Sequence, residues 1–268
     1  MEAKDLFDVN LVFTNIPDIL RFLPVTMELA LGAMAFSLIF GLIIALIRIK
    51  RVRVLSQIAA VFISVIRGTP ILVQLYVTYY GIPMFLKYLN LKYGTAYNIN
   101  NVPAILYAFV ALAINESAFN AEIIRASLQS VDRGQIEAAQ SLGMTYLQVL
   151  KRIILPEAIE VALPSLGNSF IGLIKGTSLA FTCAVVEMTA QGKILAGRNF
   201  RYFETYIMLS YSMMSITEYI RQDLHRARRH IRQHINWSLT HLMCLKRDFQ
   251  NKDFCLEIIS PNPTSDFM

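Results

Sequence analysis

Long apolar runs separated by short polar segments make up most of the first 216 residues of the chain. The run from Thr26 to Ile47 contains a single charged residue, Glu28. A helix of this length crosses the roughly 30 Å of hydrocarbon in a bilayer. The pattern predicts an all-α polytopic membrane protein with spans at 26–47, 58–84, 102–124 and 166–186 and a partial span at 202–216.

Charged residues beside these runs set the expected topology. Directly after the first run come four cations, Arg48, Lys50, Arg51 and Arg53. Because Lys and Arg accumulate on the cytoplasmic side of membrane proteins, we expect the N-terminus outside. The segment 125–164 is then cytoplasmic, and the polar segments 87–101 and 187–201 are predicted to be external loops.

The second run differs from the others because the string Arg67-Gly68-Thr69-Pro70 lies inside it. A proline removes a backbone donor and clashes with the preceding helical turn. We therefore expect the span 58–84 to be kinked at this string.

Composition supports a membrane protein and argues against several other classes. Hydrophobic residues make up 55% of the chain and charged residues only 16%, and the mean hydropathy is +0.46. The net charge of +6 comes largely from residues beside the apolar runs, and no basic surface pattern with aromatic residues accompanies it. We expect no nucleic-acid partner.

The chain lacks the sequence patterns of catalytic and metal sites. A Walker A loop needs Gly, four residues and Gly-Lys-Ser or Gly-Lys-Thr, and this order does not occur. Every histidine lies at or beyond His225, and the three cysteines have no metal-binding or disulfide-scaffold spacing. We expect no catalytic residue, no metal and no cofactor in this chain.

The cytoplasmic segment 125–164 has the pattern of two short helices. The small side chains of Ala138 and Ala139 allow another backbone to come close, and Gly143 can adopt the left-handed conformation that ends a helix. Thr145 is suited to cap a second helix, from Tyr146 to Leu155, and Pro156 is expected to stop it.

One motif in this segment resembles that of a known family. The order Glu137-Ala138-Ala139, then Gly143, then Ile153-x-Leu155-Pro156 resembles the cytoplasmic coupling loop of permease subunits of bacterial ATP-binding-cassette (ABC) importers. Three other strings resemble the polar amino acid branch of these importers, so that the resemblance spans about residues 20–212. The strings begin at Arg67 (RGTPILVQL), Ala121 (AEIIR) and Lys175 (KGTSL).

This resemblance implies a five-span importer-type permease fold with a cytoplasmic coupling helix pair, in a bacterial inner membrane. It implies an amino acid as substrate and four kinds of partner: a cytoplasmic ATPase that binds the ATP, a second identical or similar permease subunit, an extracytoplasmic solute-binding protein, and membrane lipid. The ATPase-coupling residues implied are Glu137, Ala138, Ala139, Gly143, Ile153, Leu155 and Pro156.

Three ionisable residues, Arg67, Glu116 and Lys175, lie within the apolar runs. Each costs about 2.5 to 3.5 kcal/mol on insertion scales, so each needs a reason to be there. Either they line a route on which a zwitterionic amino acid meets both charges, or Glu116 pairs with Lys175 or Arg67 to hold the spans together. The polar residues Thr69, Gln74, Asn115, Thr177 and Ser178 join the candidate pathway set, with bonding between helices as the other interpretation.

Composition changes abruptly after the fifth run. Tyr202 to Ile216 is shorter than the about 20 residues of a crossing helix, and charged residues begin at Glu218. We therefore divide the chain into a transmembrane permease domain, 1–216, and an atypical basic tail, 217–268. Either the tail's basic stretch lies on an anionic leaflet, or a reading-frame shift near residue 212 truncated the fifth span and left a disordered tail.

Two functional alternatives to the importer permease remain open. A secondary transporter or channel has the same composition and buried charges but no use for a cytoplasmic docking element. An inactive product with a damaged C-terminus is the other, because a broken fifth span prevents the bundle from forming.

Overall fold

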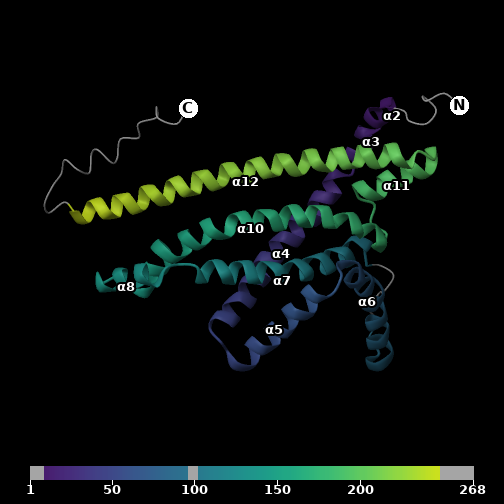
Figure 1. The fold of residues 1–268 in the computed structure, drawn as a ribbon. Helices are drawn as coiled ribbons and strands as arrows, with labels where there is room; N and C mark the ends of the chain where they lie inside the picture. The colour runs from purple at the N-terminus through teal and green to yellow at the C-terminus, as the bar shows by residue number, and fades with distance from the viewer. Residues whose placement is uncertain (1–8, 96–101, 248–268) are drawn as a thin grey trace. The chain divides into compact units, whose positions relative to one another are not determined.

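The computed structural model describes residues 9–95 and 102–247, and every regular element in this part of the chain is helical (Figure 1). The all-α fold class is thereby confirmed. The chain divides into two units, Met1–Leu224 and His225–Met268. The α-helices are α2 (Val9–Thr14), α3 (Ile16–Leu20), α4 (Leu23–Ile49), α5 (Arg53–Gly68), α6 (Ile71–Tyr93), α7 (Ala104–Gln129), α8 (Arg133–Ser141), α9 (Tyr146–Val149), α10 (Leu155–Gly176), α11 (Met188–Asn199) and α12 (Tyr202–Arg247). A π-helical turn, η2 (Leu150–Ile154), and a 3-10 helix, η3 (Thr177–Cys183), complete the set.

Two of the described helices, α4 and α7, are each long and apolar enough to cross a membrane alone. The helix α4 contains the predicted span 26–47, and α7 contains all but the first two residues of the predicted span 102–124. Two further crossings result if each bent helix pair forms one span: α5 with α6, and the run Tyr146–Cys183 with α11. Because α12 is not among the helices that meet this criterion, the total of five spans stays a prediction.

The helix breaks within the second apolar run, at the place expected from the sequence. Thr69 and Pro70 are both extended, as the residue before a proline prefers, and α5 and α6 meet there at 107°. The two helices extend beyond the predicted limits of 58 and 84, from Arg53 to Tyr93.

The helices α4 and α7 pack with their backbones close together. Four small buried residues follow one another at every fourth position of α4: Ala33, Ser37, Gly41 and Ala45. A Cβ atom on Gly41 would lie 3.0 Å from the backbone nitrogen of Ala121 and 3.2 Å from the carbonyl oxygen of Ser117. Small residues at this spacing let two membrane helices pack at short distance.

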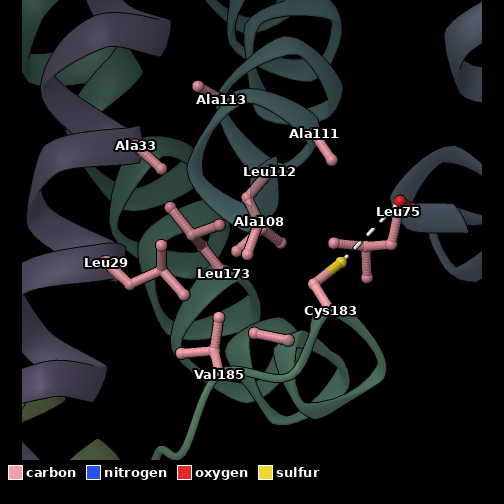
Figure 2. Packing of buried hydrophobic residues seen from close by; sticks show 11 residues of the cluster. Leu29, Ala33, Leu75, Ala108, Ala111, Leu112, Ala113, Leu173, Cys183 and Val185 are labelled. Carbon is pink, nitrogen blue, oxygen red and sulfur yellow. Dashed lines mark hydrogen bonds between the residues drawn. The ribbon is translucent and has the colours of Figure 1, made fainter. Parts of the chain in front are cut away.

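The main core joins α4, α6, α7, α10 and η3. Leu29, Leu112 and Leu173 interdigitate there with several alanines, and Leu75 of α6 faces Cys183 of η3 (Figure 2). The Cys183 thiol is buried and free, and it donates to the Leu75 carbonyl oxygen at 3.7 Å. Five elements that are distant in sequence are thus fixed around one apolar centre.

Two segments predicted to be external loops are largely helical. Residues 188–199 form α11, which is anchored by buried Met188, Leu195 and Ala196. The loop prediction was wrong because the segment is polar in composition, while Met188, Leu195 and Ala196 lie at helical spacing and are all buried. The predicted loop 87–101 begins as the last turns of α6, which ends at Gly94 with φ +65, and residues 96–101 lie outside the described residues.

The last helix, α12, begins at Tyr202, where the fifth span was predicted to start. It continues without a break past residue 217, the predicted start of the tail, and ends at Arg247. The remainder of the predicted tail, 248–268, lies outside the described residues.

Candidate functional site

The predicted coupling segment is a helix–turn–helix that begins directly after α7. Asp132 caps α8, accepting a hydrogen bond from the Gly134 backbone N–H at 2.9 Å. At its other end Gly143 has φ +80, the left-handed conformation expected from the sequence. The Gly143 and Met144 N–H groups donate back to the carbonyls of Gln140 (2.8 Å) and Ala139 (3.2 Å). These two bonds are a Schellman motif, which ends α8 sharply.

The second short helix starts as predicted at Thr145. The Thr145 backbone N–H donates to Gln148 Oε1 at 2.9 Å in a capping box, and α9 follows from Tyr146. Val149 of α9 and Ala139 of α8 are both buried, so these two residues lie on the inner faces of the pair. Of the two adjacent alanines, only Ala138 is therefore exposed to a partner, together with Glu137.

Three large apolar side chains at the tip of this helix pair are exposed, and sequence reasoning missed them. Leu142 is 60% exposed, Tyr146 65% and Leu147 64%. They face away from the pair's own buried contacts, and an exposed apolar cluster marks a contact surface for another protein or for a membrane. In the sequence these exposed residues lie between Ala139 and Val149, which are both buried, and this position around the turn was their only signal.

Pro156 does not stop the helix, and this prediction was wrong. In an α-helix the proline ring would clash with the carbonyl four residues earlier. Here the helix widens into the π-helical turn η2 just before it, and the Leu155 N–H donates to the Leu150 carbonyl five residues back. The wider turn accommodates Pro156 in the first turn of α10, so α9, η2 and α10 form one continuous helical run. Ile153 lies in η2, and Leu155 begins α10.

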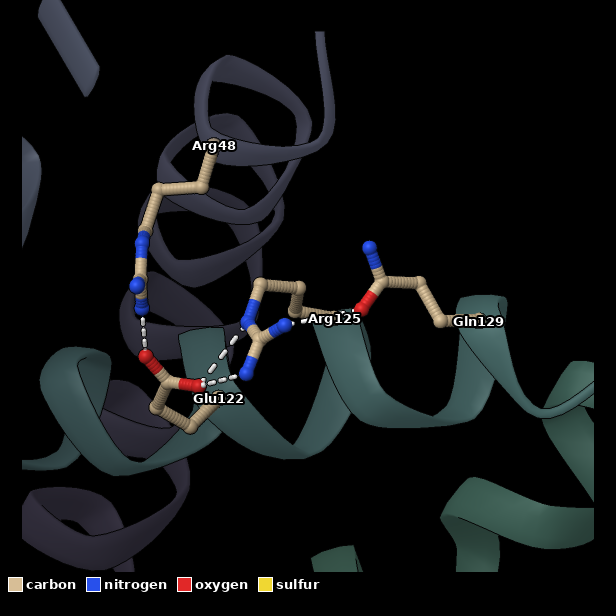
Figure 3. Close-up of polar contacts among 4 residues, drawn as sticks. All are labelled: Arg48, Glu122, Arg125 and Gln129. Carbon is tan, nitrogen blue, oxygen red and sulfur yellow. Dashed lines mark hydrogen bonds and ion pairs between the residues drawn. The ribbon is translucent and has the colours of Figure 1, made fainter. Parts of the chain in front are cut away.

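A charged cluster joins the last turn of α4 to the second half of α7 (Figure 3). Arg48 of α4 pairs through Nη1 with Glu122 Oε1 of α7. The other carboxylate oxygen, Oε2, accepts from Arg125 Nε at 2.9 Å and Nη2 at 2.8 Å, and Arg125 Nη1 donates to Gln129 Oε1 at 2.8 Å. Both oxygens of Glu122 are thus used, each by a different arginine.

Three of the predicted pathway residues come together at the bend between α5 and α6. Gln74 Nε2 donates to Thr69 Oγ1 at 2.7 Å and to the Ile66 carbonyl at 2.8 Å, which closes the bend. Gln74 Oε1 in turn accepts from Asn115 Nδ2 of α7 at 3.0 Å. These contacts join helices, as the second interpretation of these residues expected.

Glu116 lies in a polar network that includes a residue not singled out from the sequence. The Ser169 hydroxyl of α10 contacts Glu116 Oε1 and lies 2.9 Å from Asn120 Oδ1. Asn120 Nδ2 then donates to Ser37 Oγ of α4 at 2.8 Å. Three helices are linked in this way through buried polar groups.

Of the two interpretations of the buried charges, the one that paired Glu116 with Arg67 or Lys175 is not borne out in the described part of the chain. Among the described residues, Glu116 has no ion-pair partner, and the Arg67 guanidinium lies 5.2 Å from the centroid of the Phe119 ring. Lys175 is exposed at the end of α10, where its long side chain reaches an open cleft instead of the interior.

This cleft has a volume of about 550 Å³ and lies among the ends of α10 and η3, α11 and α12. Lys175, Ser178 and Thr189 supply polar groups to it, and the buried Thr189 hydroxyl has no hydrogen-bond partner within the part of the chain that the structure describes. Thr177, by contrast, is fully buried and donates to the Ile174 carbonyl at 2.7 Å. The structure thus brings Lys175 and Ser178 together at the cleft but turns Thr177 inward.

Glu187 is a second residue that sequence reasoning missed. It is fully buried and caps α11, accepting from the backbone N–H groups of Thr189 and Ala190, each at 2.9 Å. The only signal was its place directly before a short helix, which was interpreted as a loop. Within the described residues, no group of three or more His, Cys, Asp or Glu side chains is arranged to hold a metal ion.

Comparison with known proteins identifies the family. Residues 37–218 match the model of the binding-protein-dependent transport system inner membrane component. The chain belongs to this family. Its members are the membrane subunits of ABC transport systems and not enzymes, and ATP hydrolysis is carried out by a separate ATPase, as the coupling-loop resemblance implied. The inner-membrane, multi-pass character of the chain agrees with the helices that are long enough to cross a bilayer.

Individual relatives cover most of the chain. It is 44% identical over 219 residues to the probable amino-acid permease protein YxeN of Bacillus subtilis, which covers 81% of this chain and 93% of that protein. It is 38% identical to the L-cystine transport system permease protein TcyL of the same organism, with 76% and 84% covered. A crystal structure of an amino acid ABC transporter with histidines matches with a TM-score of 0.70 and 35% identity, covering 84% of this chain and 99% of that chain.

Proposed function

We propose that this chain is the transmembrane permease subunit of an ATP-driven importer for polar amino acids. The observation that carries this is the coupling element: a capped helix pair with an apolar tip, built at the positions of the importer motif inside a chain of the importer family. Relatives named for amino acid transport at 38% and 44% identity support the substrate class. Within that class we favour cystine or an amino acid with a cationic or amide side chain.

The proposed mechanism is alternating access driven from the cytoplasm. Two copies of an ATPase close on ATP, the coupling element moves with them, and the spans rock so that the route opens outward. Hydrolysis then restores the inward-open state. Such coupling requires that the ATPase bind one conformation of the bundle more tightly than the other.

The continuous helix through η2 supports a mechanical role for the coupling element. Because α9, η2 and α10 form one helical run, a displacement of the helix pair is delivered directly to α10. On its other side α8 follows α7 after a short connection. The element is therefore joined covalently to two bundle helices at once.

The proposed assembly contains two permease subunits, identical or similar, two ATPase subunits and an extracytoplasmic solute-binding protein. In this arrangement the N-terminus is outside and the coupling element is in the cytoplasm. The cations after α4 and the coupling element would then lie on the same side of the membrane, as the positive-inside bias requires.

For the pathway we propose that the cleft at Lys175 and Ser178 receives the carboxylate end of the solute. A cation and hydroxyl groups converge there, and the unpartnered Thr189 hydroxyl offers a further hydrogen bond. The remaining pathway candidates, Arg67, Thr69, Gln74, Asn115, Glu116 and Thr177, make contacts within the bundle and act by holding the helices that surround the route.

Reconstitution tests the proposal directly. The chain is co-expressed with its ATPase and assembled in liposomes together with the binding protein, and uptake is measured against a panel of labelled amino acids. We expect uptake of a polar amino acid that requires ATP. Uptake driven by an ion gradient without ATP would favour the secondary transporter instead, and a complex that assembles but moves no amino acid would refute the substrate class.

A further inference from the structure

The cluster around Glu122 contains an ion pair between two helices, formed by Arg48 of α4 and Glu122 of α7. This pair lies at the end of α4 nearest the coupling element. Arg48 lies in the last turn of α4, and Glu122 lies two turns before the end of α7. Their side chains are only partly exposed, 26% for Arg48 and 20% for Glu122. The pairs Glu122–Arg125, Arg201–Glu204 and Glu218–Arg221 instead join residues three positions apart in the chain.

Arg125 holds the Glu122 carboxylate in place for Arg48. Its Nε and Nη2 both donate to Oε2, and these charge-assisted hydrogen bonds fix the position of that oxygen. Gln129, one turn further on, holds Arg125 from the other side. The carboxylate is therefore oriented by residues of α7 alone, with Oε1 presented to α4.

The place of this pair in the chain gives it mechanical significance. The helix α7 leads directly into α8, and α10 is reached through η2, so both helices are joined covalently to the coupling element. The helix α4 has no such connection. It is held on α7 by close packing along the seam of small residues that includes Ser37 and Gly41, by the Asn120–Ser37 hydrogen bond, and by the Arg48–Glu122 pair.

We propose that Arg48 is a coupling residue, which through Glu122 makes α4 move together with α7 when the ATPase displaces the coupling element. This inference rests on the proposed function. Without the pair, the ATPase still moves α7 and α10, but α4 does not follow them fully. A fraction of the hydrolysis events then moves no solute. The measurable consequence is a lower ratio of solute moved to ATP hydrolysed.

The test compares three variants in the reconstituted importer. Arg48→Gln removes the α4–α7 pair and is expected to lower the transport-to-hydrolysis ratio by about two- to fivefold, the effect of a partly exposed ion pair. Arg48→Lys retains the charge and should recover most of the ratio. Arg221→Gln, the matched control, removes the exposed Arg221–Glu218 pair of α12 and should leave the ratio of the unmodified protein.

A second measurement separates coupling from simple loss of stability. With the three native cysteines replaced by alanine, Arg48→Cys and Glu122→Cys are joined by a bifunctional thiol reagent with a short flexible spacer. Joining the helices should raise the ratio above that of the same protein before cross-linking, which a protein damaged by the substitutions would not do. An unchanged transport-to-hydrolysis ratio in Arg48→Gln, or no recovery of the ratio on cross-linking, would overturn the proposal. Failure of the unmodified complex to transport would instead count against the proposed function.

Discussion

At the scale of single residues, Gly143 has the clearest conformational requirement in the coupling element. Its φ of +80 costs a residue with a side chain about 1 to 2 kcal/mol, although the space around it is open. Gly143→Ala should therefore alter the angle of the helix pair and weaken ATPase binding about fivefold or more, measured as the affinity of the purified ATPase for the permease. Gly197→Ala, also in open space but within α11, serves as the control, and equal affinities in the two variants would refute the role of the turn.

Glu187 is the residue on which α11 depends. Its carboxylate satisfies two backbone N–H groups at a fully buried helix start. Glu187→Ala leaves both groups without a partner and should destabilise the protein by about 1 to 2 kcal/mol. Thermal unfolding of the purified permease measures this. Glu187→Asp keeps a capping carboxylate and should lose less, so an equal loss in the two variants would show that the cap is unimportant.

At the scale of helices, the sequence was sufficient where one feature dominated. Apolar length predicted α4 and α7, Pro70 predicted the break before α6, and Gly143 with Thr145 predicted the turn of the coupling element. It failed where two features competed. Pro156 argues for a stop, but the π-helical turn η2 accommodates it, and such a turn has no local sequence signature.

The candidate pathway shows the same limit. Polar residues in apolar runs can be identified from the sequence, but their partners come from other helices. Gln74 meets Asn115 and Glu116 meets Ser169 only because α6, α7 and α10 pack together. No spacing within a single helix indicates these pairs.

The seam between α4 and α7 makes a prediction about helix packing. Gly41→Ala places a methyl group against backbone atoms of Ala121 and Ser117, which cannot move aside as a flexible side chain would. We expect a loss of about 1 to 3 kcal/mol, the usual cost of overpacking, measured as resistance of the purified protein to thermal or detergent-induced unfolding. Gly172→Ala in α10 meets no atom within 4 Å and should be neutral or slightly stabilising. A neutral Gly41→Ala would mean that the helices are further apart than the seam indicates.

At the scale of the whole molecule, the covalent and non-covalent connections converge on the coupling element. It follows α7, continues into α10, and lies on the side where Arg48 and Glu122 join α4 to α7. In a bundle with these connections, a displacement of the coupling element alone can move the helices joined to it. That arrangement is what a transporter without its own ATP site needs, and a secondary transporter or channel has no use for it.

The exposed tip of that element gives the last prediction. Leu142, Tyr146 and Leu147 form the apolar surface available to the ATPase, and apolar or aromatic residues at the centre of an interface often contribute 2 kcal/mol or more. Leu147→Glu should therefore weaken capture of the ATPase about thirtyfold while leaving membrane insertion unchanged. Gln140→Ala, an exposed polar position on the same helix pair, is the matched control and should bind normally. If Leu147→Glu retained both ATPase binding and ATP-driven uptake, the ATPase would bind another surface of the protein. Loss of ATPase binding with full uptake would instead identify a transporter that needs no ATPase.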